Sequence, residues 1–263
     1  MPYRSQKELR RWKRHNGRAS LEIEAGRAFH PGKKQYLNIP LPFGPKARLV
    51  LIHLNSEAIK TGSPTIEVED SMTAFVKRLL KRNPNGREVK DFKNQLSALS
   101  AATIRLAIVA DERAVQINTN IVTAFDFWFT KNPNQRVLWP SAVRLSHEYF
   151  DTLVKHAIPL DERAIAALSH SAMALDVYVW LAQRLHRINL GNPQFIPWTT
   201  LSEQFGQGFA RIRKFREKFL LVLRRVQSQY PAARIEADKT GLILWQSLPP
   251  VPKRFIAFDG GGI

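Results

Sequence analysis

Residues 209–230 constrain this chain most, because their side chains separate into an apolar and a basic face at helical spacing. Such spacing predicts an amphipathic helix. Its apolar side chains are Ile212, Phe215, Phe219, Val222, Leu223 and Val226, and its basic ones include Arg211, Arg213, Lys214, Lys218 and Arg225. Leu221 lies among the cations and would be exposed unless it meets a thymine methyl or a protein surface. The basic face suits a duplex groove, and the alternative is a surface helix with solvated cations.

The charge of the whole chain points to a polyanionic partner. The 263 residues include 40 Lys and Arg against 22 Asp and Glu, a formal net charge of +18. A hydrophobic content of 44% is enough for a real core. The sequence has no cysteine, and no apolar run approaches the roughly 18 residues of a membrane span. We therefore expect a soluble cytoplasmic protein, without signal peptide or membrane contact, that binds nucleic acid.

Residues 1–37 are predicted to form a mobile basic N-terminal arm. Its cations are Arg4, Lys7, Arg10, Arg11, Lys13, Arg14, Arg18, Arg27, Lys33 and Lys34. Only Glu8, Glu22 and Glu24 oppose them, and glycines and prolines interrupt any long element. We expect the arm to contact phosphates without sequence preference, and the alternative is that it only raises solubility.

Residues 38–132 are predicted to form the first folded domain. The expected elements are helix 46–61, strand 65–68, helix 70–81 capped by Asp70, helix 87–102, and strands 103–110 and 114–129 joined by a turn. This order is that of a winged helix, whose third helix enters the major groove while the hairpin wing touches the backbone. The polar side chains left outside on the third helix are Arg87, Lys90, Lys93, Asn94 and Ser97.

A second domain, residues 158–248, is predicted to repeat the order helix, helix, basic helix, hairpin after a linker over residues 133–157, and residues 249–263 are predicted to form a tail. The expected elements are a long helix 161–187, a short helix 201–205, the basic helix 209–230, and strands 234–237 and 242–246. Within the linker, residues 137–145 could add a strand and residues 146–156 a short helix or strand extension. The repeat lies in element order and not in residue identity. The expected fold is α+β, mainly α, with two tandem winged-helix domains and the basic arm.

Motifs for catalysis or metal binding are incomplete in this sequence. Residues 26–34 have the wrong glycine spacing for a phosphate loop. His147 and Glu148 begin like a zinc-protease helix, but Asp151 occupies the place of the second histidine. His53 is expected to be a core or rim histidine. We therefore expect a binding protein without cofactor or metal rather than an enzyme.

Several motifs occur together between residues 38 and 106. Prolines lead into GPKAR, an aliphatic helix ends in KTG, a short strand precedes a serine-led helix, and KDFKNQLSALSAATIRL follows. With these features the stretch resembles the RepA replication initiators of broad-host-range and related bacterial plasmids. The resemblance covers most of the first domain, and it extends to the second domain only in general layout.

The resemblance implies a winged-helix protein that binds repeated sequences at a plasmid origin, helps to open the duplex, and recruits host replication proteins such as a helicase or initiator. Related initiators often repress their own promoter as dimers, so a homodimer is possible. The implied location is the bacterial cytoplasm, with the nucleoid or the plasmid. Ser97 and Ala98 stand where more basic character is expected, which shifts base reading toward the second domain.

We expect double-stranded DNA to contact both basic helices. The predicted contacts are Arg87, Lys90, Lys93, Asn94 and Ser97 on one helix and Arg211, Arg213, Lys214, Lys218 and Arg225 on the other. Arginine is suited to guanine, asparagine to adenine, and lysine mainly to phosphate. Two alternatives stay open: a DNA-binding transcriptional repressor without initiator activity, and an RNA-binding protein or nucleic-acid-processing enzyme.

Overall fold

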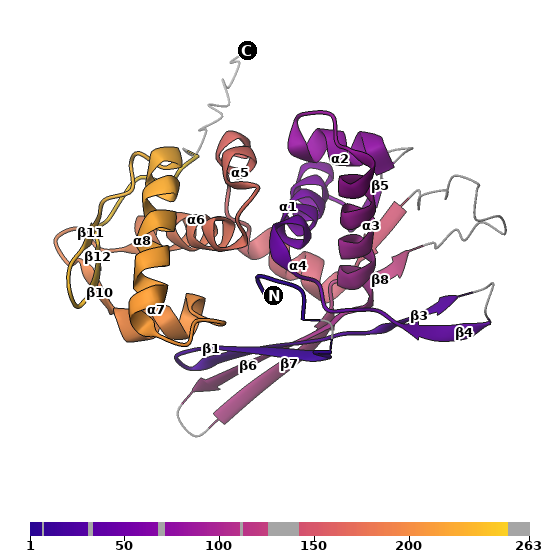
Figure 1. Ribbon diagram of the computed structural model, residues 1–263, viewed down its shortest axis with the longest axis horizontal. Coiled ribbons are helices and arrows are strands. Elements are labelled where there is room, and N and C mark those ends of the chain that lie inside the picture. Colours follow the sequence, from indigo (N-terminus) through magenta and orange to yellow (C-terminus); the bar gives the residue numbers. More distant parts are fainter. Residues whose placement is uncertain (7, 31–33, 68–71, 111–112, 126–141, 252–263) are drawn as a thin grey trace, which may run out of the picture.

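The computed structural model describes the chain except for residues 7, 31–33, 68–71, 111–112, 126–141 and 252–263. It is a mixed α+β protein with several small antiparallel sheets. Two groups of helices lie side by side, and a longer sheet runs beneath them (Figure 1). None of the helices in the described part of the chain is long and apolar enough to cross a bilayer.

The first unit begins with the predicted order of elements. These are α1 (Gly44–Thr61), β5 (Thr65–Glu67), α2 (Met72–Leu80) and α3 (Gly86–Ala101). Gly62 ends α1 in the left-handed conformation, with φ 64°, where glycine is not strained. Asn85 opens α3 with a capping box: its side chain accepts from the Glu88 N–H, and the Glu88 carboxylate accepts from the Asn85 N–H. The Asp70 cap lies outside the described residues.

The sheet of the first unit differs from the predicted one. β5 pairs with β9 (Ala142–Leu145), and β9 pairs with β8 (Val122–Phe125), so the order is β5-β9-β8. α4 (His147–His156) follows, capped by the Ser146 hydroxyl, and packs against α1. Residues 142–156, expected in a linker, therefore belong to the first unit, because β9 supplies its central strand.

The predicted hairpin after α3 is present, but it pairs with the N-terminal residues. Its strands are β6 (Thr103–Ala110) and β7 (Arg113–Asn120), and the N-terminal strands are β1 (Arg11–Asn16), β2 (Ala19–Glu24), β3 (Arg27–His30) and β4 (Gln35–Asn38). β1, β2, β6 and β7 form one antiparallel sheet in that order, and β3 pairs with β4. The expectation of a mobile arm is therefore wrong for residues 11–30 and 35–38, which form these four strands and the turns described between them.

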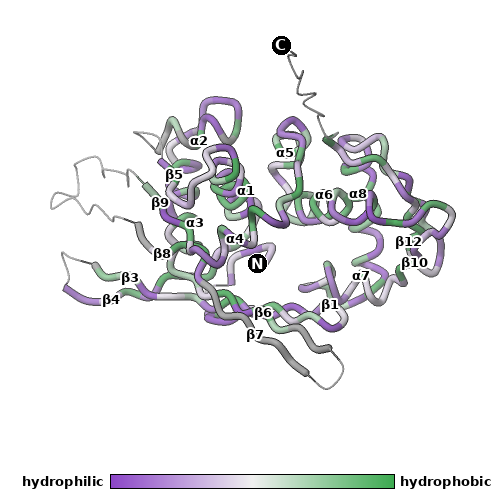
Figure 2. Tube along the Cα trace, turned by 180° about the vertical axis from the view of Figure 1, so that it is seen from behind, coloured by the Kyte–Doolittle hydropathy of each residue, from purple (hydrophilic) through white to green (hydrophobic). Residues whose placement is uncertain are grey.

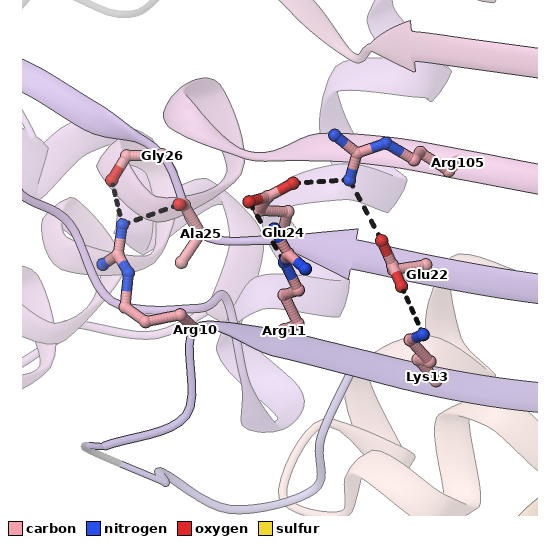
Figure 3. A network of polar contacts seen from close by, with 8 residues as sticks. All are labelled: Arg10, Arg11, Lys13, Glu22, Glu24, Ala25, Gly26 and Arg105. Atoms are coloured by element: carbon pink, nitrogen blue, oxygen red, sulfur yellow. Dashed lines mark hydrogen bonds and ion pairs between the residues drawn. The ribbon is translucent and has the colours of Figure 1, made fainter.

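Opposite charges join the strands of this sheet (Figure 3). The Arg105 guanidinium of β6 donates to Glu22 at 3.1 Å and to Glu24 at 2.5 Å. Lys13 and Arg11 of β1 bind the same two carboxylates, at 3.0 and 3.3 Å respectively. Hydrogen bonds from Lys13 to Glu22 and from Arg105 to Glu24 hold the pKa of each carboxyl below its ordinary value. Lys13 and Arg11 are thus engaged within the protein.

Arg10 fixes the path of the chain between β2 and α1. Its guanidinium donates to the carbonyl oxygens of Ala25, Gly26 and Ile39, at 2.7, 2.9 and 2.7 Å. Gly26 passes so close to the end of α3 that a Cβ there would lie 1.7 Å from the Ala101 carbonyl oxygen. Only glycine fits this crossing, so Gly26 has a packing role.

The second unit begins with two helices where one was predicted. These are α5 (Glu162–Leu168) and α6 (Ala172–Arg184), and a 3₁₀ turn, Leu185–Arg187, extends α6. The prediction of one helix over 161–187 is wrong because Ser171 caps α6, accepting from the Ala174 N–H at 3.2 Å. The buried side chains of Leu168, Ala172 and Leu175 keep helical spacing across the break, so periodicity does not reveal it.

The rest of the second unit repeats the layout of the first. Its elements are β10 (Gln194–Pro197), α7 (Trp198–Phe205), α8 (Ile212–Gln229), β11 (Ile235–Ala237) and β12 (Gly241–Leu244). The sheet order is β10-β12-β11, so the last strand lies between the other two, as β9 does in the first unit. The predicted repeat of element order is confirmed, with β8 and β9 in the place expected for β6 and β7.

A buried ion pair joins the two units. Arg48 of α1, with a side chain only 5% exposed, donates to both carboxylate oxygens of Asp176 on α6, at 2.6 and 2.8 Å. Arg14 of β1 lies 3.8 Å from the same carboxylate and 5.1 Å from the ring centroid of Phe205 in α7. α6 packs against both α1 and α8. The N-terminal sheet, α1 and α6 therefore meet at one carboxylate.

His53 lies on α1 and is 9% exposed, which agrees with the expectation of a core or rim histidine. Its Nε2 lies 2.7 Å from Nη2 of Arg78. Because arginine can only donate, Nε2 accepts and the ring is neutral. Burial, and then the charge of Arg78, lower the pKa of His53 to about 4.

This shift predicts a pH dependence of stability. The unfolded chain takes up a proton at His53 near pH 6.5, and the folded protein only near pH 4, so the free energy of unfolding should fall as the pH drops through that window. The loss due to His53 is about 2 to 3 kcal/mol. We expect urea unfolding at about pH 7 and about pH 4 to show a smaller decrease for His53→Gln than for the unmodified protein. Equal decreases in both proteins would contradict this assignment.

Candidate nucleic-acid interface

α8 presents the apolar stripe that the sequence predicts, except at its first residue. Phe215, Phe219, Val222, Leu223 and Val226 are buried, whereas Ile212 is 47% exposed. The prediction for Ile212 is wrong because the Phe209 ring, 5.8 Å from the Phe215 ring, packs at this end of the stripe. The buried stripe fixes which side of α8 faces solvent.

The outer face of α8 is basic, as expected. Arg211, Arg213, Lys214, Lys218 and Arg225 are all exposed. Glu217 accepts a hydrogen bond from Lys214 at 2.9 Å and lies 3.7 Å from Arg213, and the bond from Lys214 lowers the pKa of this carboxyl. Across the described ranges, no carboxylate forms an ion pair with the other three cations. Leu221 is 53% exposed, as predicted from its place among the cations. The structure therefore brings all five predicted cations to the surface, with Arg211 at the N-cap of α8 and the other four on the helix.

Arg216 has a different role, which sequence reasoning missed. Its guanidinium donates to the carbonyl oxygens of Asp238 and Lys239, at 3.0 and 3.2 Å, and lies 5.2 Å from the ring centroid of Trp198. The Asp238 carboxylate accepts from the N–H and the hydroxyl of Thr240 at 2.6 and 2.7 Å. Hydrogen bonds from the Thr240 side chain and then from neighbouring backbone N–H groups hold the pKa of Asp238 below its ordinary value. Arg216 thus fastens α8 to the turn between β11 and β12.

Lys239 is a further candidate contact that the sequence analysis did not select. It lies exposed in the turn between β11 and β12, and its own carbonyl oxygen is one of the two that Arg216 binds. The sequence Asp-Lys-Thr-Gly at residues 238–241 could have indicated this contact. Its aspartate accepts from the Thr240 N–H and so stabilises a tight turn, in which Lys239 is exposed.

On α3 the predicted residues are less uniformly exposed. Arg87, Lys90 and Asn94 are exposed, whereas Lys93 and Ser97 are half-buried. Burial lowers the pKa of Lys93. α3 therefore offers a weaker cationic face than α8.

The predicted residues form two separate groups in the structure. α1 and α6 lie between α3 and α8, and views from both sides show the two helices apart (Figures 1 and 2). The two groups could only act on one ligand if that ligand were long. Within the described ranges there is no group of three or more His, Cys, Asp or Glu that could hold a metal ion.

The fold and the basic helices define a two-unit α+β protein with a candidate nucleic-acid surface on each unit. A crystal structure of RctB domains 2-3 matches with a TM-score of 0.58 and 8% identity, covering 92% of this chain and 94% of that chain. A selenomethionine derivative of RctB domains 2 and 3 matches with a TM-score of 0.60 and 9% identity, covering 94% of each chain. At such low identity the likeness shows the fold alone.

The family is shown by the sequence. The family model for the plasmid encoded RepA protein matches residues 41–199, more than half of the chain. This chain belongs to that RepA family, and the resemblance given by residues 38–106 is confirmed. No curated protein matches the sequence.

Proposed function

We propose that this protein is a plasmid replication initiator that binds repeated sequences in origin DNA. It then helps to open the duplex and recruits host replication proteins such as a helicase or initiator. It also represses its own promoter as a homodimer. Membership of the plasmid-encoded RepA family supports this function. The observation that carries the DNA-binding part is the exposed basic face of α8, beside the turn that Arg216 holds.

The layout of both units supports winged-helix domains. In a winged helix the third helix enters the major groove, and a hairpin beside it touches the backbone. α3 and α8 hold the position of the third helix, and β8–β9 and β11–β12 hold the position of the hairpin. Residues 126–141, between β8 and β9, lie outside the described part of the chain.

The proposed contacts are those predicted from the sequence, with α8 dominant. Arg211, Arg213, Lys214, Lys218 and Arg225 would contact one repeat or half-site, and Arg87, Lys90, Lys93, Asn94 and Ser97 another. Lys239 would contact the backbone beside α8. The half-burial of Lys93 and Ser97 supports weaker base reading by the first unit.

The test uses DNA that flanks the gene, where direct repeats would identify the origin. If six to ten phosphates are neutralised, affinity for a duplex repeat should fall by about 10³ to 10⁵ between about 50 and 200 mM salt. Fluorescence anisotropy with a labelled repeat measures this slope, and a shuffled duplex of equal length is the control. Nearly constant affinity over that range, or equal affinity for both duplexes, would contradict the proposal.

A transcriptional repressor would use the same exposed faces of α3 and α8, so the binding assay does not separate the two functions. Deletion of the gene does so. Loss of plasmid maintenance supports the initiator, whereas a plasmid that persists without the gene supports a repressor.

A further inference from the structure

β3 and β4 form a two-stranded hairpin that extends to one side of the molecule, away from the second unit (Figures 1 and 2). Its register places Phe29 opposite Tyr36 and Arg27 opposite Asn38. Because side chains alternate along a strand, these four residues share one face of the hairpin. Residues 31–33, between the strands, lie outside the described residues.

Two aromatic rings are exposed on this face. Phe29 is 47% exposed and Tyr36 is 61% exposed, and their ring centroids lie 5.4 Å apart at an interplanar angle of 65°. The Arg27 guanidinium carbon lies 5.7 Å from the centroid of the Tyr36 ring. A cross-strand aromatic pair stabilises a hairpin, but hairpin stability alone does not require cations around exposed rings.

The surroundings of the rings are cationic. The sequence contains no Asp or Glu between Glu24 and Glu57, and Arg27 lies on β3 itself. Lys34 is exposed directly before β4. Such a combination of stackable rings and unopposed positive charge complements a ligand that has both aromatic faces and phosphates. An apolar protein surface would match the rings but not the cations.

We infer that the β3–β4 hairpin binds unpaired bases of single-stranded DNA, which stack on Phe29 and Tyr36 while Arg27 and Lys34 contact the phosphates. A single strand exposes base faces that a duplex hides, and aromatic platforms flanked by cations bind such strands with little sequence preference. The inference rests on the proposed function, because duplex opening at the origin supplies the single strand. The hairpin lies apart from α8, so it binds the opened strand while α8 holds the duplex (Figure 1).

The experiment uses the full chain with Phe29→Val and Tyr36→Val together, since valine keeps a high strand propensity but offers no ring. The probe is a labelled oligothymidylate of about 16 nucleotides, long enough for a single-domain site. We expect the affinity for oligothymidylate to fall roughly 5- to 150-fold for each base that loses the aromatic side chain on which it stacks. The affinity for the duplex repeat should be unchanged. Gln35→Val is the matched control, because Gln35 is exposed on the opposite face of β4. It should leave both affinities unchanged.

A second measurement does not depend on the folding of a variant. Photo-cross-linking of the unmodified protein to an oligonucleotide with 5-iodouracil should label the peptides that contain Phe29 or Tyr36, as mass spectrometry would show. Absence of oligothymidylate binding, cross-links only elsewhere, or equal affinity of the double variant would overturn the inference. Unchanged single-strand affinity with weakened self-association in sedimentation would assign the rings to a protein contact instead.

The two proposals fail in distinguishable ways. If the unmodified protein binds oligothymidylate through the hairpin but ignores the duplex repeat, the origin-binding proposal fails and the hairpin site stands. If duplex binding is strong and single-strand binding is absent, only the hairpin inference fails.

Discussion

Replacing Lys214 and Lys218 of α8 with glutamate should lower affinity for a duplex origin repeat by at least about 100-fold at about 150 mM salt. Both side chains are exposed on the side of the helix next to the buried stripe of Phe215 and Phe219. The double substitution removes two phosphate contacts and places two negative charges against the DNA backbone. The apolar stripe is untouched, so the protein should remain folded.

Anisotropy titration measures the affinity of this variant, and circular dichroism measures its thermal unfolding. Lys155→Glu with Arg163→Glu is the matched control, because it makes the same change of net charge at exposed positions on α4 and α5. The control should bind nearly as well as the unmodified protein. Equal losses in both double variants would show that overall charge, and not the α8 face, determines binding.

Replacing Asp176 with alanine should lower the free energy of unfolding by about 3 to 5 kcal/mol, because it leaves a buried cation unpaired. The Arg48 side chain is 5% exposed, and its carbonyl partners at Gly44 and Met1, 2.9 and 2.8 Å away, do not neutralise its charge. The pair joins residues 128 positions apart in the chain. Its loss should also loosen the contact between α1 and α6, which sets the two units relative to each other.

Urea unfolding followed by circular dichroism measures this effect. The matched variant is Arg48→Met with Asp176→Leu, which removes both charges and should recover much of the lost stability, since apolar side chains of similar size can replace a buried ion pair. Exposed ion pairs contribute less than about 1 kcal/mol to stability. If Asp176→Ala lowers the free energy of unfolding by less than that amount, solvent reaches Arg48.

Helices that are marked by residues within their own sequence could be predicted from the sequence alone. α1, α3 and α8 each bury one face of a helical repeat, and Gly62 and Asn85 mark where two of them end or begin. For α8 the same periodicity predicts which cations are exposed, so the candidate surface follows from the stripe of Phe215 to Val226.

Features that depend on distant partners could not be predicted in this way. The sequence around Arg11 and Lys13 predicts a basic arm. In the structure Glu22 and Glu24 bind these two cations and also Arg105, which lies more than 80 residues after the glutamates in the chain. Strand pairing assigned β9, and not β7, to the sheet of the first unit, and no residue type near β9 indicates this choice. Similarly, Arg216 looks like any other cation on α8, because its carbonyl partners lie in a later turn.

The pairing of β2 with β6 also orders events during synthesis. The hairpin of β1 and β2 leaves the ribosome early, but Arg105 is translated 81 residues after Glu24. At about 5 to 20 residues per second, the outer edge of β2 waits on the order of ten seconds for its partner. During that interval the edge of β2 that later pairs with β6 has no partner. A strand of another nascent chain on the same messenger RNA could pair with this edge. Glu22 and Glu24 on β2 favour a partner strand that places a cation opposite them, as β6 does with Arg105.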